Sequence, residues 1–416
     1  MTLHPILTAL RRHKAGVILI SLQIALTLAI VCNAIFIIGQ RIQRLNRPTG
    51  LDEKNLFLVT QVWVGAPTGD DQASIDKLDS MQRADVQTLR NLADVESAIA
   101  INSMPLVDST WVNGVRLKPN QKHDTASAAF YFSDEKMLPT LGLKLIAGRN
   151  FTPADIGHRG FRDTNTSAIV IITKALADKL FADGNAVGKT IYIANNTTPS
   201  TVIGVVERLQ IPSANNWARR LAFNSIIEPV RLDAYFARYA IRAKNGRLDS
   251  AMREARDALF AVNPMRVIDD DGGVRPFSEI RARAYRADRG MAILMGVICL
   301  ILLGVTSAGI VGLTSFWVGQ RHKQIGVRRA LGARKLDILR YFQIENLMIA
   351  GVGAAAGIAL AVGLNLWLMH RFEMDRIPIV YVLLGIAVVL LLGQAAVFIP
   401  ARRASNVPPV VATRSV

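Results

Sequence analysis

Residues 321–334 read RHKQIGVRRALGAR and lie between two long apolar segments, residues 290–320 and 346–370. The flanking segments contain no Asp, Glu, Lys or Arg, whereas this stretch carries five lysines or arginines and no acidic residue. Its apolar residues form a short stripe that Gly332 ends, made of Ile325, Val327, Ala330 and Leu331. The sequence therefore predicts two membrane helices joined by a basic connector with an amphipathic core, which another molecule binds.

Two further segments, residues 15–40 and 377–401, are equally free of charged side chains. About 20 apolar residues cross a hydrocarbon core of about 30 Å, and a charge at a helix centre costs about 2.5–3.5 kcal/mol on insertion scales. The apolar residues are continuous and not striped, which argues against amphipathic soluble helices. A cleaved signal peptide is the alternative for the first segment, but its apolar part is long and no small-residue cleavage site follows. Four membrane helices are predicted.

The positions of lysines and arginines predict the orientation of these helices. Arg11, Arg12 and Lys14 precede the first helix, the connector is basic, and Arg402, Arg403 and Arg414 follow the fourth. Cytoplasmic loops carry an excess of such residues, so both termini are expected in the cytoplasm. The predicted layout is a cytoplasmic segment at 1–14, helices at 15–40, 290–320, 346–370 and 377–401, an external domain at 41–289, a cytoplasmic connector at 321–345, an external loop at 371–376 and a cytoplasmic tail at 402–416.

The net charge of +17 is largely explained by this topology. The basic residues are not interleaved with aromatic residues and form no nucleic-acid module, so no nucleic-acid partner is predicted. Both cysteines, Cys32 and Cys299, fall inside membrane segments. The external domain is therefore expected to fold without disulfides, and membrane lipid is the expected surroundings of the helices.

The external domain reads as mixed α/β. Expected strands are 56–64, 168–173, 190–194, 200–206, 239–242 and 265–268, and expected helices are 74–92, 174–182 and 248–262. Residues 113–165 are read as turn-rich because Gly and Pro punctuate them. The charged ends, 40–47 and 281–289, continue the first two membrane helices and are expected to pair as a stalk.

Signals for catalysis or ligand binding are weak. Residues 184–190 (GNAVGKT) resemble a phosphate-binding loop, but only three residues separate the glycines and a strand follows instead of a helix. Residues 269–273 (DDDGG) lack the ligand spacing of a calcium loop and read as a turn. The histidines have no zinc-like spacing, and no nucleophile elbow occurs. No catalytic, cofactor-binding or metal-binding residue is predicted on this chain.

The membrane segments contain small residues at helix-packing spacing. Gly353 and Gly357 form a Gly-x-x-x-Gly pair, and Gly304 and Gly312 belong to a small-residue face of the second helix. Such residues allow helices to approach closely, either within one chain or between two copies, and the sequence leaves both alternatives open. The segments carry no ionisable residue at mid-membrane, so a conduit for polar solutes is not expected.

Three stretches together resemble the MacB/FtsX-like permease family of ABC transporters. Residues 320–333 are similar to the family pattern of basic residues, Ile-Gly and Ala-x-Gly-Ala before the third helix. Residues 400–404 with 408–412 resemble the closing Pro-x-x-x-Ala and Pro-hydrophobic-Ala sequence. Residues 141–152, with Gly188-Lys189 and 203–206, resemble the periplasmic core domain. The similarity follows the order of parts along nearly the whole chain.

The resemblance implies an α-helical protein of the bacterial inner membrane, with four transmembrane helices and a large α/β periplasmic domain between the first and second. It implies a non-catalytic permease that acts as a dimer, homodimer or heterodimer, with a cytoplasmic ATPase that binds ATP and Mg. A periplasmic adaptor and an outer-membrane channel are further implied partners for efflux or export. The connector would be the coupling helix through Gln324, Ile325, Gly326, Arg328, Arg329, Ala330, Leu331, Gly332 and Ala333.

Gln324 stands where the family usually has Glu, and the connector could be basic for topological reasons alone. Only 14 residues precede the first predicted helix and about 15 follow the fourth, so the ATPase is expected on a separate chain. Besides extrusion of a peptide, lipopeptide, lipoprotein, siderophore or antibiotic, the alternatives are a transmitter that regulates a periplasmic enzyme and, outside the family, a membrane-anchored sensor.

Overall fold

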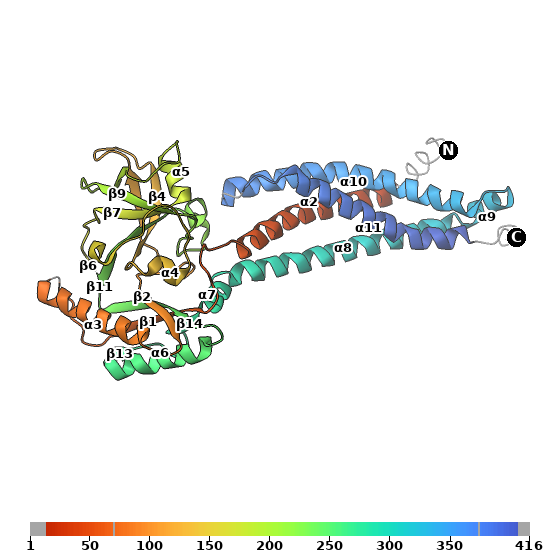
Figure 1. Cartoon of the computed structure of the whole chain (residues 1–416). Coiled ribbons are helices and arrows are strands. Elements are labelled where there is room, and N and C mark those ends of the chain that lie inside the picture. Colours follow the sequence, from red (N-terminus) through yellow and green to blue (C-terminus); the bar gives the residue numbers. More distant parts are fainter. Residues whose placement is uncertain (1–13, 70, 373–374, 407–416) are drawn as a thin grey trace. The chain divides into compact units, whose positions relative to one another are not determined.

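A computed structural model describes residues 14–69, 71–372 and 375–406. The chain divides into two compact units, one formed by both ends of the chain and the other by Arg47–Arg286 (Figure 1). Most of the predicted N-terminal segment and the closing motif at 408–412 lie outside the described residues, as do Arg11, Arg12, Arg414 and residues 373–374 of the predicted external loop.

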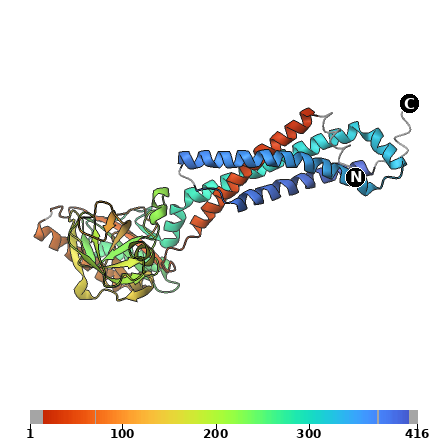
Figure 2. The same cartoon turned by 90° about the horizontal axis from the view of Figure 1, so that it is seen from above.

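The helical unit contains five described helices. They are α2 (Lys14–Leu45), α8 (Arg286–Gln320), α9 (His322–Ala330), α10 (Lys335–Phe372) and α11 (Ile379–Ser405). All except α9 are long and apolar enough to cross a membrane, and Figure 2 shows them running roughly side by side. The chain is a membrane protein with four transmembrane helices, as the sequence predicts.

The connector, predicted as a loop at 321–345, is mostly helical in the structure. Residues 335–345 are the start of α10, so the only non-helical part beyond α9 is a short turn. The Asp337 carboxylate accepts the backbone N–H of Arg334 at 3.0 Å, which supplies a partner to the first turn of α10. Helix-favouring Lys, Leu and Arg residues then continue the helix into the apolar segment.

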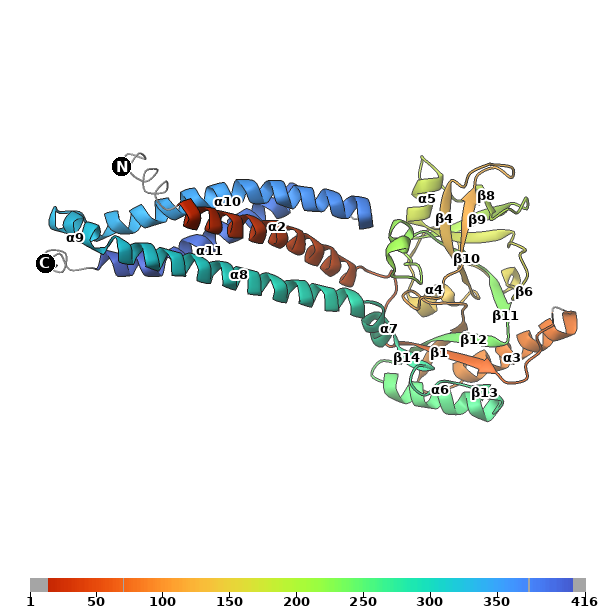
Figure 3. The ribbon, with the colours of Figure 1, turned by 180° about the vertical axis from the view of Figure 1, so that it is seen from behind.

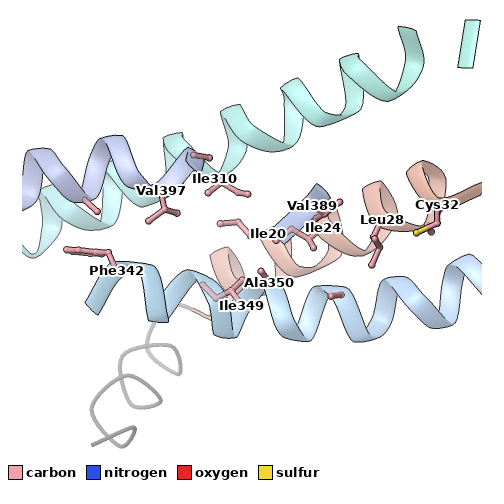
Figure 4. Close-up of a cluster of buried hydrophobic side chains, with 14 of the residues drawn as sticks. Ile20, Ile24, Leu28, Cys32, Ile310, Phe342, Ile349, Ala350, Val389 and Val397 are labelled. Carbon is pink, nitrogen blue, oxygen red and sulfur yellow. The ribbon is translucent and has the colours of Figure 1, made fainter. Parts of the chain in front are cut away.

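All four membrane helices contribute side chains to one apolar core. Helix α10 packs along α2, and α11 contacts both. Figure 4 shows the residues that meet there, Ile20, Ile24, Leu28 and Cys32 of α2, Ile349 and Ala350 of α10, Val389 and Val397 of α11, and Ile310 of α8. Continuous apolar sequence on each helix allows it to be covered by neighbours on one side and by lipid on the other.

The first sheet of the external domain has β1 (Leu56–Trp63) near its centre. The order is β13-β1-β12-β2, with β14 also paired to β1, and all described pairings are antiparallel. The remaining strands are β2 (Val95–Ala100), β12 (Phe236–Ala243), β13 (Arg266–Val267) and β14 (Val274–Pro276). One face packs against α3 (Gln72–Arg90) and α6 (Leu248–Val262) (Figure 3).

The second sheet closes on itself. Its order is β5-β9-β7-β10-β4-β3-β8, and β8 also pairs with β9. Its strands are β3 (Val112–Arg116), β4 (Ala126–Phe132), β5 (Leu145–Gly148), β7 (Ile169–Thr173), β8 (Thr190–Ile193), β9 (Ser200–Val206) and β10 (Ser225–Glu228). The smaller elements are α4 (Met137–Leu141), α5 (Lys174–Leu180), α7 (Phe277–Ala284), the paired strands β6 (Gly157–Gly160) and β11 (Val230–Asp233), and 3-10 turns at Pro153–Asp155 and Asn216–Leu221.

The mixed α/β prediction is confirmed, and α6 has the predicted bounds. Residues 113–165, read as turn-rich, also contain β3, β4, α4, β5 and β6, which the sequence did not predict. Strand β4 (ASAAFYF) is almost entirely buried and is paired on both sides, so it shows no alternation of polar and apolar residues. Its burial depends on neighbours that are distant in sequence.

The predicted pairing between residues 40–47 and 281–289 is present where α2 ends and α8 begins. Arg41 forms an ion pair with Asp288, and Arg44 lies 3.7 Å from the same carboxylate. Within the external domain, the Arg281 guanidinium donates to the carbonyl of Arg47 at 2.6 Å and to Glu53 at 2.7 Å. In each unit, the entering and leaving segments are therefore joined by arginine contacts.

Candidate coupling helix and helix interfaces

Helix α9 is anchored at its start by an ion pair. Arg321, the residue just before α9, places Nη1 at 3.0 Å from both carboxylate oxygens of Glu345 in α10. The Glu345 side chain is only 2% exposed. A carboxylate this buried is costly without a partner, so the pair ties the start of α9 to α10.

The end of α9 is equally well defined. Gly332 has a φ of +97°, and its N–H donates to Arg329 O at 3.2 Å while Ala333 N–H donates to Arg328 O at 3.0 Å. This is a Schellman motif, which favours glycine because other residues rarely adopt positive φ. The Arg329 guanidinium also donates to the Ala333 carbonyl at 3.1 Å. The turn into α10 is thus held by backbone and side-chain bonds.

The nine predicted coupling residues divide between two faces. Ile325 and Gly326 are buried, and Ile325 belongs to the same core as Trp317 and Phe342. These two positions face the core of the chain itself and do not contact a partner from there, although both are among the nine predicted coupling residues. Arg329 and Ala333 are half-buried, whereas Gln324, Arg328, Ala330, Leu331 and Gly332 are exposed.

The exposed face of α9 combines apolar and basic side chains. Leu331 is 83% exposed, and Val327 and Leu336 are also exposed. Arg328 lies over the Tyr341 ring at 5.2 Å, and His322, Lys323, Arg334 and Lys335 are exposed around it. Val327 belongs to the stripe seen in the sequence but not to the predicted coupling residues, and Leu336 was missed because it lies beyond Gly332. This face suits an acidic partner surface with an apolar pocket.

The four predicted packing glycines have different surroundings. A Cβ on Gly353 would meet Ser21 O at 2.8 Å, and one on Gly357 would meet Ala25 O at 2.9 Å. Both glycines therefore allow α10 to approach the α2 backbone. A Cβ on Gly304 or Gly312 of α8 would meet nothing within 4 Å. The structure brings the first pair into an interface within the chain and leaves the second pair open.

The two ligand-like motifs, residues 184–190 and 269–273, form turns held by contacts within the chain. Lys189 bonds both carboxylate oxygens of Asp183 at 2.8 and 2.7 Å, in the turn between α5 and β8. At the end of the Asp269–Gly273 segment, the Gly273 N–H donates to Asp269 O at 2.8 Å. Across the residues that the structure describes, no three His, Cys, Asp or Glu side chains are grouped to hold a metal ion.

Two family models cover most of the chain. Residues 21–258 match the MacB-like periplasmic core domain, and residues 296–409 match the FtsX-like permease C-terminal domain. The chain belongs to the MacB/FtsX-like permease family. The family prediction from the sequence is confirmed, and the external domain is a periplasmic core domain.

Relatives match over the permease region. The macrolide export ATP-binding/permease protein MacB of Chromobacterium violaceum is 29% identical over 273 residues, covering 65% of this chain and 40% of that protein. The pyoverdine export ATP-binding/permease protein PvdT of Pseudomonas fluorescens is 29% identical over 280 residues, again covering 65% and 40%. The solved periplasmic region of MacB from Actinobacillus actinomycetemcomitans is 18% identical, with a TM-score of 0.35, and covers 58% of this chain and 97% of that structure. The chain spans about two fifths of the length of the curated relatives it matches.

Proposed function

We propose that this chain is the permease subunit of a MacB-like ABC transporter that extrudes a substrate. In this proposal, a cytoplasmic ATPase on another polypeptide binds ATP and Mg and contacts the exposed face of α9. Membership of the family supports an ABC ATPase partner in general. The observation that carries the proposal is the contrast between the two faces of α9, one buried among the membrane helices and the other apolar and basic but uncovered.

A helix that transmits force must be fixed to the body that it moves. The Arg321–Glu345 pair and the Gly332 turn hold the two ends of α9, and Ile325 packs into the membrane core between them. Displacement of α9 by an ATPase would therefore displace α10 as well. The absence of a charged residue from the middle of the membrane segments supports a mechanical role over a polar conduit.

The topology belongs to the same proposal. The basic residues around α9 and after α11 favour a cytoplasmic position for this end of the helices and an inner-membrane location. A second permease, a periplasmic adaptor and an outer-membrane channel complete the proposed machine. The alternative is a transmitter that regulates a periplasmic enzyme, for which the match to the FtsX-like permease C-terminal domain is the specific support. Export of a substrate from the periplasm would favour the transporter, whereas a change in cell-wall hydrolysis alone would favour the transmitter.

Leu331→Asp tests the coupling face directly. Leu331 contacts no core, so the variant is expected to fold, while a carboxylate in place of the exposed apolar side chain opposes docking to an acidic surface. We expect the affinity for the partner ABC ATPase to fall about 30-fold, the effect of losing one hot spot of about 2 kcal/mol. The measurement is co-purification and titration of the ATPase against the full chain in lipid nanodiscs.

The matched control is Val262→Asp at the end of α6, another exposed apolar residue. It is expected to bind the ATPase like the native chain. Gly326→Trp is a poor test because Gly326 is buried, and a large side chain there disturbs the core of the chain itself. Unchanged ATPase affinity in Leu331→Asp would contradict the assignment of α9 as the coupling helix.

A further inference from the structure

One face of the first periplasmic sheet is covered along only part of its length. Leu56 and Leu58 of β1 point to the face opposite α3 and α6, and both are buried. Arg242, opposite Leu56 on β12, donates to the Thr140 carbonyl of α4 at 2.8 Å, so α4 closes this end. From Thr60 onward, the same face of β1 carries half-buried and exposed side chains. The sheet thus offers a partly open surface.

Two arginines flank Thr60 on this open surface. Arg238 on β12 is paired with Thr60, and Arg275 on β14 is paired with Leu58, one step away on the same face of β1. Directly paired residues of antiparallel strands point to the same side of a sheet. The two guanidiniums therefore project from the strands on either side of β1 toward the same region.

Neither arginine forms an ion pair in the described part of the chain, although Glu279 and Asp269 are close enough to Arg275 to offset part of the lowering of its pKa by burial. Arg238 donates from Nη1 to the Asn102 carbonyl at 2.6 Å, but its Nε is buried and unpaired. The Nε of Arg275 is also buried and unpaired. Burial lowers the pKa of both guanidiniums, and the charge of Arg275 lowers the pKa of Arg238 further. Both side chains are half-buried, and an anion would add hydrogen bonds to guanidinium groups that the described chain leaves incompletely paired.

An exposed apolar strip begins beside the arginines. Val62 of β1 is paired with Val267 of β13, and the next pair along the ribbon is Val64 with Met265, whose carbonyl accepts the Val64 N–H at 2.9 Å. All four side chains are exposed, Val267 by 57% and Met265 by 56%. Phe236, on the other side of Val62, lies 5.6 Å beneath the Arg238 guanidinium and connects the strip to the cationic pair.

We propose that this face of the periplasmic domain binds a small anionic amphiphile. Arg238 and Arg275 would hold an oxyanion head, since guanidiniums bind phosphate and carboxylate with paired N–H bonds. The apolar chain would lie along Val62 and Val267 toward Met265. This binding does not depend on the proposed contact between α9 and an ATPase.

The size of the surface favours a small amphiphile over a protein segment. From Thr60 to Val64 the strip is about 13 Å long at about 3.3 Å per residue, which suits one acyl chain. A standard protein interface covers about 800 Å² on each partner, far more than these side chains provide. Strand β13 pairs only two residues with β1, so the sheet edge offers little backbone to an added strand.

Photolabelling of the full chain in phosphatidylcholine nanodiscs tests the site. The probe is dodecyl phosphate with a diazirine at the end of its chain, and the labelled residues are mapped by mass spectrometry. We expect labels within residues 62–64 and 265–267, displaced by unlabelled dodecyl phosphate and not by neutral dodecyl maltoside. Equal displacement by both competitors, or labels confined to the membrane helices, would overturn the proposal.

The double variant Arg238→Gln with Arg275→Gln separates binding from folding. Labelling is expected to fall about tenfold or more because charge-assisted hydrogen bonds to the head are lost. The unfolding temperature is measured as well, because Arg238→Gln removes the bond to the Asn102 carbonyl, and labelling is compared at a temperature where both chains are folded. Arg247→Gln, at an exposed arginine 3.9 Å from Asp94, is the matched control and should label normally. Native labelling by the double variant would rule out the anion site.

Discussion

The two glycine pairs of the membrane unit have the same character in sequence and different surroundings in the structure. On α10, Gly353 and Gly357 lie against the backbone of α2, where a Cβ would come within 3 Å of a carbonyl oxygen. On α8, Gly304 and Gly312 face space that no other part of the described chain occupies. Small residues at regular spacing allow close approach, but only the position of a partner shows whether that approach occurs within the chain.

The two helices are also held by different interactions. The contact between α10 and α2 is close and largely apolar, with Ile24 and Leu28 packed against the glycines. Helix α8 contacts α2 through a small apolar cluster around Val31 and Cys299 and, in addition, through polar bonds, including Thr27 to Thr306 at 2.7 Å and Gln23 to the Val305 carbonyl at 3.1 Å. We therefore expect added volume to damage the α10 interface and loss of polar groups to weaken the α8 interface.

The largest effect is expected for Gly357→Leu. The new side chain would overlap Ala25 O and Leu28, so α10 must move away from α2 along the interface. Overpacking of a close interface costs about 1–3 kcal/mol and occasionally more, and contact with a backbone atom places this variant at about 3 kcal/mol. Unfolding of the full chain in mixed micelles, titrated with a denaturing detergent, measures the loss.

Gly363→Leu is the matched control on the same helix. A Cβ at Gly363 meets nothing within 4 Å, and replacing glycine inside a helix is favourable by roughly 0.5–1 kcal/mol. The control should therefore be as stable as the native chain or more stable. Equal losses in both variants would show that α10 tolerates no added volume anywhere, and the distinction between closed and open glycines would fail.

A smaller effect is expected for Thr306→Val, which removes the acceptor of the Thr27 hydroxyl. Thr306 donates its own proton to the Leu302 carbonyl at 2.8 Å, so Thr27 is the donor of the bond between the helices. Hydrogen bonds between membrane helices contribute about 0.6 kcal/mol on average and up to about 1.7 kcal/mol, and we expect a loss of about 1 kcal/mol. A double-mutant cycle with Thr27→Val measures the coupling, and additive losses would argue against this bond.

The sequence predicted features that depend on local patterns or on long uncharged segments. It predicted the four membrane helices, α6, the turn at Gly332 and the pairing of the charged ends near Asp288. It did not predict β4, whose small and aromatic residues give no alternation, or the burial of Ile325 on the inner face of α9. Both depend on contacts with segments far away in the sequence. The Arg238–Arg275 pair is invisible in sequence for the same reason, because only strand pairing places both residues beside Thr60.

The smallest effect on stability is expected for Gly304→Leu. Nothing lies within 4 Å of a Cβ at this position, so the unfolding free energy should stay within about 0.5 kcal/mol of the native value, as for substitutions away from close contacts.

The same Gly304→Leu variant distinguishes the two roles that the sequence leaves open for this glycine, packing within one chain and packing between two copies. If a second permease packs against α8, energy transfer between labelled chains in vesicles should fall while the stability of each chain is unchanged. If energy transfer between the labelled chains is also unchanged, this face of α8 contacts lipid. Gly357 then lies in a helix interface and Gly304 lies in none. A stability loss as large as that of Gly357→Leu would mean that α8 packs more closely against its own chain than the open surroundings of Gly304 indicate.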